Sequence, residues 1–237
     1  LHYIGFNTQK APFDSQALRS ALSLGIDRAS IISAFLSGHG KAAQSPVSPV
    51  TSLYPEDLDQ DYSYDAFAQA MAQAGFDSGH SRSATLLVNS ENSFKVSAAN
   101  AIAQALSAFD LDIEVKALPW AEYTAALAAG QFDLYYGEIK LTADWNLTAL
   151  LGTGGSANYG KWADPQTDAL LASCAAAADR AAAIHTLCAH LRSECPIIPI
   201  CFKSTSVLVQ DGVVDVLQPT MANPFYDFSS CTVHLQA

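Results

Sequence analysis

The sequence has few charged residues, few basic ones among them, and no long apolar run. Only 15% of its 237 residues are charged, and 12 lysines and arginines stand against 23 aspartates and glutamates, which gives a formal net charge of −11. This balance repels polyanions, and no basic stripe offsets it, so we expect no nucleic-acid partner. Polar residues interrupt every apolar stretch before it reaches membrane length, so we expect no transmembrane helix.

The motifs of common enzyme and cofactor sites are also missing. There is no Gly-x-Ser-x-Gly elbow and no His-Glu-x-x-His, and the glycine-rich segment 152–155 lacks the Lys-Ser/Thr of a P-loop. We therefore expect no enzyme, no cofactor and no bound metal. The main rival is a hydrolase, which requires a Ser or Cys within hydrogen-bond reach of a cleft histidine, the candidates being His39, His80, His185, His190 and His234.

Five cysteines leave at least one thiol unpaired, and no Cys-x-x-Cys spacing indicates zinc or a redox centre. Cys188 lies on an apolar helical face, where a free thiol behaves as a small hydrophobe. His185 and His190 are five residues apart, so a helix points them in different directions and they make a poor metal pair. Cys195 and Cys201 flank a predicted strand, and their pairing is left open.

Hydrophobic periodicity predicts alternating strands and helices with a long surface connection over 42–62. Strand, helix, strand, helix and strand follow one another between residues 84 and 137, a βαβ pattern that predicts an α/β fold with a mainly parallel sheet flanked by helices. The predicted strands are 2–7, 84–89, 112–116, 132–137, 197–202, 206–210 and 232–235. The predicted helices are 16–25, 28–36, 64–74, 92–109, 119–129, 147–151, 164–178 and 179–193. The expected caps are Asp14 or Ser15 for the first, Asp27 for the second, and Asp164 and Asp179 for the last two.

One carboxylate follows the predicted strand at 132–137. Asp144 lies past the carboxyl end of this strand and next to Trp145, before a short helical pattern. Open α/β sheets bind ligands in crevices outside the carboxyl ends of their strands. An acid beside an aromatic ring suits a ligand that carries an amine. The alternative is that Asp144 only caps the following helix.

Motifs along nearly the whole chain, in order, resemble the peptide/nickel family of ABC-type extracellular solute-binding proteins. The opening segment 6–14, with Asn7 and Pro-Phe-Asp, resembles the start of the family signature. Arg-Ser-Ala at 19–21 and Gly-Ile-Asp-Arg at 25–28 resemble its continuation. Later matches are Trp120, Tyr123, Gly130 to Asp133, Ala143-Asp144-Trp145, Asn158-Tyr159 and the Pro-x-x-Pro strand at 196–199.

The resemblance implies a two-lobed, periplasmic-binding-protein-like clamp that captures a peptide or another amine-bearing solute. Such a clamp delivers the solute to the permease subunits of an ABC importer. Residues 1–205 would be the second, carboxyl-terminal lobe, and residues 206–237 would be closing strands and a tail that return toward the first lobe. We expect a secreted, lipid-anchored monomer outside the cell or in the periplasm.

The resemblance also implies site residues. Asp144 takes the position of the aspartate that pairs with a peptide's α-ammonium, and Tyr136, Glu138 and Trp145 are candidate pocket walls. Leu141 stands where the family often has Trp, and Trp145 replaces the usual Tyr. A nickel, metal-complex or oligosaccharide ligand is therefore an alternative to a peptide.

Overall fold

The computed structural model describes residues 1–220 and 223–234, and these fall into two compact units. The first is Leu1–Lys203 and the second is Ser204–Ala237. All candidate site residues belong to the first unit. No helix in the described ranges combines the length and apolar character needed to cross a bilayer.

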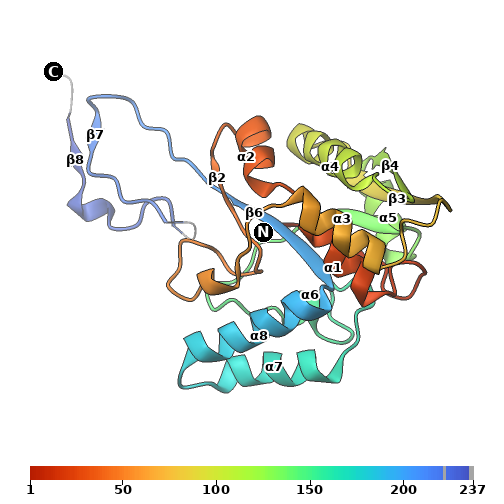
Figure 1. Cartoon of the computed structure of the whole chain (residues 1–237). Helices are drawn as coiled ribbons and strands as arrows, with labels where there is room; N and C mark the ends of the chain where they lie inside the picture. Colours follow the sequence, from red (N-terminus) through yellow and green to blue (C-terminus); the bar gives the residue numbers. More distant parts are fainter. Residues whose placement is uncertain (221–222, 235–237) are drawn as a thin grey trace. The chain divides into compact units, whose positions relative to one another are not determined.

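Six strands of the first unit form one mixed sheet in the order β2-β6-β1-β5-β3-β4. Figure 1 labels β2, β6, β3 and β4 of this sheet. The six strands are β1 (His2–Phe6), β2 (Gly40–Ala42), β3 (Arg82–Asn89), β4 (Leu111–Leu118), β5 (Leu134–Glu138) and β6 (Ile197–Lys203). β3 pairs in parallel with β4 and β5, whereas β1 pairs antiparallel with β5 and β6, and β2 with β6.

The α/β class is therefore confirmed, and the parallel half of the sheet is the βαβ interval from which it was predicted. The other half corrects the expectation of a mainly parallel sheet. The crossover rule applies to consecutive strand–helix–strand units only. β1 and β6 come from the two ends of the unit, and the rule does not fix their direction.

Six of the eight helices of the first unit begin after a residue whose side chain caps them. The eight helices are α1 (Gln16–Leu24), α2 (Arg28–Leu36), α3 (Tyr64–Gln73), α4 (Ser93–Leu106), α5 (Trp120–Ala128), α6 (Thr148–Leu151), α7 (Pro165–Ala176) and α8 (Arg180–Glu194). Ser15, Asp27, Asp164 and Asp179 each accept a hydrogen bond from a backbone N–H of the first turn. This satisfies donors that a helix start leaves unpaired. Ser15, and not Asp14, caps α1.

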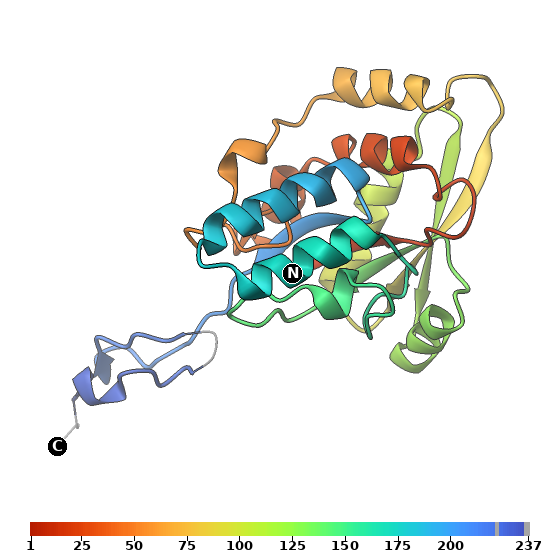
Figure 2. The same cartoon turned by 90° about the horizontal axis from the view of Figure 1, so that it is seen from below.

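Each face of the sheet buries its own apolar core. On one face Ile4, Phe6 and Leu134 pack with residues of α1 to α4. On the other face Tyr3 and Tyr135 pack with residues of α5 to α8. Adjacent residues of a strand point to opposite faces, which is why β1 and β5 supply both cores. Figure 2 shows α7 and α8 side by side, as in Figure 1.

Two glycines let tyrosine rings lie flat on the sheet. Gly137 of β5 pairs with Tyr3 of β1, and Gly5 of β1 pairs with Tyr135 of β5. A Cβ at Gly137 would be 2.3 Å from Cζ of Tyr3, and one at Gly5 would be 2.2 Å from Cε1 of Tyr135. The two rings meet edge to face, with centroids 5.7 Å apart. Any side chain at either glycine would displace a buried ring.

Two buried arginines join α1 to the end of α8 and α2 to β6. Arg19 donates to the carbonyls of Phe13, Asp14, Glu194 and Cys195 at 2.8–3.0 Å. Arg28 donates to the carbonyl of Pro199 at 2.8 Å and also to carbonyls of the α1–α2 turn. The arginines of the signature are therefore structural groups.

Two further sequence-based expectations need correction. The segment 42–62 is not wholly on the surface, because Ala43, Val47 and Tyr54 are buried against Ile184 and Cys188 of α8. Residues 206–210 form no strand; their apolar side chains have no sheet to pair with, and Leu208 is 94% exposed. In the second unit β7 (Val214–Asp215) instead pairs with β8 (Thr232–Val233). Leu235, the last residue of a predicted strand, lies outside the described residues.

Asp164 joins the start of α7 to α8. Its Oδ2 accepts hydrogen bonds from the backbone and hydroxyl of Thr167, both at 2.7 Å, and lies 2.8 Å from Nε2 of His190. Burial would raise the pKa of Asp164, but the hydrogen bonds with Thr167 and His190 outweigh it and hold the pKa at about 2. The carboxylate therefore favours the folded state only while it is charged.

We expect this group to make stability depend on pH in the acid range. Because the folded pKa is depressed, its contribution is complete above the unfolded pKa of about 4 and is lost as the pH falls toward about 2. In Asp164→Asn, which keeps a capping oxygen, urea unfolding between pH 5 and pH 2 should lose less free energy than in the wild type. Asp112→Asn, on the exposed side of β4, is the control and should follow the wild-type profile. Parallel profiles for Asp164→Asn and the wild type would contradict the assignment.

Candidate functional site

Polar side chains gather at the edge of the sheet where β3 and β5 end. Asn89 is the last residue of β3, Glu138 is the last residue of β5, and His2 pairs with Glu138 at the start of β1. Lys95 lies in the first turns of α4, the helix that follows β3. Because β3 and β5 are parallel, their carboxyl ends meet at one edge. This is the edge predicted to hold a ligand.

Glu138 is the acidic centre of this group. Its Oε2 is 2.6 Å from Nζ of Lys95, and its Oε1 is 3.7 Å from Nε2 of His2. Burial would raise the pKa of Glu138, but the hydrogen bond from Lys95 and the nearby positive charges outweigh it, so the pKa is lowered. With 44% of its side chain exposed, Glu138 is a charged group that solvent can reach.

Two buried polar atoms near Glu138 have no hydrogen-bond partner within residues 1–220 and 223–234. Burial lowers the pKa of His2 to about 4, so the imidazole is neutral near pH 7 and its contact with Glu138 is not an ion pair. His2 Nδ1 and the hydroxyl of Tyr136 are both unpartnered. The ring of Tyr136 lies in the core, with its edge toward His2 and Phe94. Tyr136 thus packs in the core under this edge of the sheet and does not line the wall of an open pocket.

Asp144 lies on the exposed loop between β5 and α6. Its Oδ1 accepts hydrogen bonds from the hydroxyl of Thr142 and from the backbone N–H of Asn146. The bond from Thr142 is the main reason why the pKa of Asp144 is lowered, so the carboxylate is charged. Asp144 does not cap α6, because the side chain of Asn146 accepts the N–H of Thr148 instead. The capping alternative is therefore wrong.

The loop at Asp144 is held from two sides. The guanidinium of Arg180, at the start of α8, donates a hydrogen bond to the backbone carbonyl of Asp144. Trp145 is half-buried, and its ring meets Phe202 of β6 edge to face at 5.9 Å. The backbone of Trp145 has φ of +51°, a left-handed conformation that costs a bulky residue roughly 1 kcal/mol or more. Such strain is concentrated at functional loops, which makes this one a candidate.

The described residues give little support to a metal site or to a hydrolase site. No group of three or more His, Cys, Asp or Glu side chains there could hold a metal ion. His190 contacts a hydroxyl, that of Thr167 at 3.2 Å, but Thr167 is fully buried and Asp164 also caps α7. A substrate cannot reach that hydroxyl. Thr167, Asp164 and His190 therefore have a structural role.

The sequence did not single out Lys95, His2, Asn89 or Arg180. The position of Lys95 could have been predicted from the sequence. A cation in the first turns of a helix that follows a parallel strand lies near the carboxyl end of the neighbouring parallel strand. His2 could have been placed opposite Glu138 only by knowing the register of β1 and β5. Arg180 depends on how α8 packs, and no local pattern predicts that.

Comparisons with known proteins agree with this fold. A profile of bacterial extracellular solute-binding proteins, family 5 Middle, matches residues 1–161. The periplasmic oligopeptide-binding protein OppA of Haemophilus influenzae is 30% identical over 190 residues, covering 73% of this chain and 34% of that protein. The heme-binding protein A of the same species is 42% identical over 79 residues, covering 32% of this chain and 14% of that protein.

Among solved structures, HbpA2 from Haemophilus parasuis matches with a TM-score of 0.82 and 21% identity, covering 99% of this chain and 48% of that one. This match shows the fold. The chain spans less than half the length of the curated relatives it matches. The matched profile covers most of the first unit, and we conclude that the chain belongs to the bacterial extracellular solute-binding proteins, family 5.

Proposed function

We propose that this chain is the carboxyl-terminal lobe of a two-lobed receptor that captures a peptide, or a related amine-bearing solute, for an ABC importer. The whole receptor acts outside the cytoplasmic membrane and delivers its solute to the permease subunits. It is a binding protein and not an enzyme. A lipid anchor and a monomeric state are part of the same prediction.

The observation that carries this proposal is the Asp144 carboxylate. It is charged, exposed and oriented by Thr142 and Asn146. Its loop is fixed by Arg180 and by the packing of Trp145 on Phe202. A carboxylate fixed in advance can accept a charge-assisted hydrogen bond from an ammonium group with little loss of side-chain freedom. Trp145 offers its half-buried ring beside the same ligand.

The remaining predicted site residues take different roles in this proposal. Glu138, neutralised by Lys95, would contact polar parts of the solute farther along the same edge of the sheet. Tyr136 would support the site from within the core, because it is almost fully buried. Direct ligand contact therefore falls to Asp144, Trp145 and Glu138.

The second unit supports the proposed division into lobes. Its apolar side chains are largely exposed, including Leu208 at 94%, Phe225 at 65% and Val216 at 61%. A two-stranded ribbon as short as β7 and β8 is marginal by itself in water. A segment of this kind needs another surface to cover it, and the first lobe of the receptor would supply one.

The test is calorimetric titration of the full-length receptor with di- to pentapeptides and with the same peptides acetylated at the amino terminus. Asp144→Asn should weaken binding of a free peptide about tenfold or more, the effect of losing a hydrogen bond between charged groups. Acetylation should weaken binding to the wild type by a similar factor.

The matched control is Asp112→Asn, which removes an exposed carboxylate from β4 and should leave affinity unchanged. If Asp144→Asn binds free peptides as tightly as the wild type, Asp144 does not hold the ammonium. If acetylated and free peptides bind equally well, the solute class is wrong.

A further inference from the structure

One asparagine next to the Asp144–Trp145 pair stands in an acceptor sequence for N-linked glycans. Of the seven asparagines in the chain, Asn146 alone has Ser or Thr two positions later, in Asn146-Leu147-Thr148. Asn-x-Ser/Thr, with any x except proline, is the acceptor sequence, and it lies in surface loops of secreted proteins. Bacterial enzymes of this kind also read an acidic residue two positions before the asparagine, where this chain has Asp144. Because the motif is short, the exposure and contacts of Asn146 decide whether it is available.

The segment that carries this motif is open to solvent. Residues 139–147 form no helix or strand, and α6 adds only four helical residues after them. Asp144, Asn146 and Thr148 are exposed, whereas Leu147 is buried and anchors the loop. A helix as short as α6 has little stability of its own. The asparagine and the hydroxyl that an enzyme must read together are therefore both accessible on one short stretch of chain.

The side-chain nitrogen of Asn146 is free to react. Its Oδ1 accepts a hydrogen bond from the backbone N–H of Thr148 at 2.9 Å, which orients the side-chain amide. Its Nδ2, the atom that would carry a glycan, donates to no group within residues 1–220 and 223–234, and the hydroxyl of Thr148 has no partner there either. The one side-chain hydrogen bond of Asn146 therefore fixes the amide and leaves its nitrogen available.

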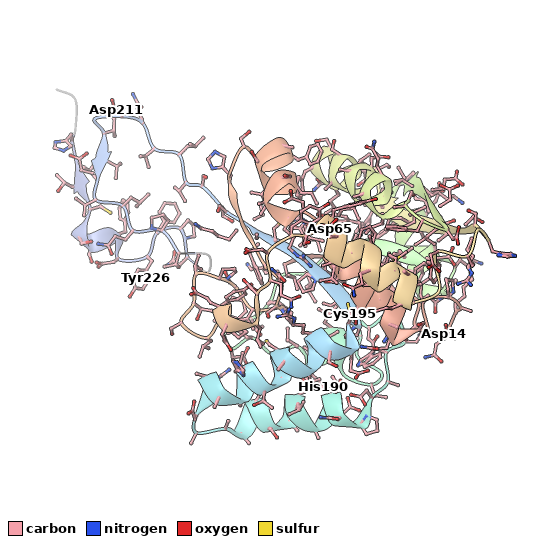
Figure 3. The ribbon with its side chains drawn as sticks, viewed as in Figure 1. Asp14, Asp65, His190, Cys195, Asp211 and Tyr226 are labelled. Carbon is pink, nitrogen blue, oxygen red and sulfur yellow. The ribbon has the colours of Figure 1, made fainter. Side chains whose placement is uncertain are left out.

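The contacts that hold the loop leave the acceptor side chain uncovered. Arg180 donates to the backbone carbonyl of Asp144 from the start of α8, the helix on which Figure 3 labels His190. The ring of Trp145 packs against Phe202. These two contacts use the backbone of one neighbour and the ring of the other. Neither involves the side chain of the asparagine, so the loop stays in place while that side chain faces solvent.

We propose that Asn146 is a site of N-linked glycosylation, whose donor is a glycan carried on a polyprenyl pyrophosphate. In this transfer Nδ2 attacks the anomeric carbon of the first sugar and a C–N bond forms. The bond from that carbon to the pyrophosphate oxygen breaks, the pyrophosphate leaves with the electron pair, and Nδ2 gives up one proton. The family to which the chain belongs is extracellular, which agrees with a modification found in secreted proteins.

The position of this site predicts an effect on solute binding, and this part of the inference rests on the proposed function. Asn146 is two residues from Asp144, and its backbone N–H donates to that carboxylate. A glycan attached here would compete with an ammonium group for access to Asp144. The glycosylated receptor should therefore bind free peptides about tenfold or more weakly than the unmodified receptor, the scale of one lost hydrogen bond between charged groups.

The experiment incubates the full chain with a bacterial oligosaccharyltransferase and a polyprenyl pyrophosphate that carries a single N-acetylhexosamine. Mass spectrometry should show a gain of one sugar, which peptide mapping places on Asn146. Thr148→Ser keeps the hydroxyl and should be modified, whereas Thr148→Val, of nearly the same shape, should react about a hundredfold more slowly, because a site that reads a hydroxyl rejects the analogue without it. Asn146→Gln should gain no sugar. Far-UV circular dichroism checks that each variant is folded.

A synthetic peptide of residues 142–150 separates the acceptor sequence from its presentation by the fold. A modified peptide beside an unmodified chain would overturn the site, as would the absence of a sugar on both. Equal rates for Thr148→Val and Thr148→Ser, or a sugar on Asn146→Gln, would also overturn it. These outcomes are measured by mass and do not depend on what the receptor binds. Unchanged peptide affinity in the glycosylated full-length receptor would contradict the effect on binding, while titrations of the unmodified receptor test the proposed function separately.

Discussion

Arg19→Met is expected to lower the free energy of unfolding by about 3–5 kcal/mol, which is the scale found when a buried charged network loses one partner. Methionine keeps the unbranched stem of the arginine as far as the position of Nε but donates nothing, so four backbone carbonyls, those of Phe13, Asp14, Glu194 and Cys195, lose their donor. Each buried acceptor left unsatisfied costs about 1–3 kcal/mol, and local water entry recovers part of that sum. The guanidinium also lies 5.4 Å from the ring centroid of Trp162, a contact that the variant loses.

Urea unfolding at pH 7 measures this effect, with Arg82→Met as the matched control. Arg82 is exposed and lies over the ring of Phe76 at 4.3 Å, an arrangement worth about 0.5–1 kcal/mol. Arg82→Met should therefore lower the free energy of unfolding several times less than Arg19→Met does. Equal midpoints for the two variants would show that the carbonyl contacts of Arg19 contribute nothing specific.

Gly137→Ala should destabilise the protein by about 2–3 kcal/mol, at the upper part of the range for an overpacked core. The added methyl group would lie 2.3 Å from Cζ of Tyr3. The ring cannot move freely away, because it is buried and packs edge to face against Tyr135. The cost is thus steric, and it should disappear if the ring is removed.

A double-mutant cycle with Tyr3→Leu tests this cause. Tyr3→Leu alone loses ring packing, but it opens the space above position 137. The loss of unfolding free energy in the double variant should be smaller than the sum of the losses in the two single variants by about 1 kcal/mol or more, as expected for residues in direct contact. Strict additivity would mean that the methyl group is accommodated elsewhere.

Local sequence signals predicted the helix starts and the parallel half of the sheet. Asp27, Asp164 and Asp179 cap helices as expected, because capping needs only a short polar side chain before an apolar stripe. Two other features differ from the expectation, each for its own reason. The strand expected at 206–210 has the right composition but no neighbour to pair with, and β2 is only Gly40–Ala42, too short for any periodicity.

The candidate site was predicted in part. Its place followed from Asp144 lying past the end of a strand, and the structure gives that aspartate an exposed, oriented carboxylate. The role of Asp144 as a ligand contact stays a prediction, as do those of Trp145, Glu138 and Tyr136. Lys95 and Arg180, which hold Glu138 and the Asp144 loop, come from helices far away in sequence. Only their packing brings them to this edge.

The position of β1 has a consequence for how the protein is made. His2–Phe6 form an inner strand whose two neighbours are β5 and β6, so β1 is synthesised well before either of its partners. At about 5–20 residues per second, translation needs on the order of ten to forty seconds to reach β6. Until then β1 presents two open edges and its apolar side chains. The sheet therefore closes only after nearly all of the first unit has been translated.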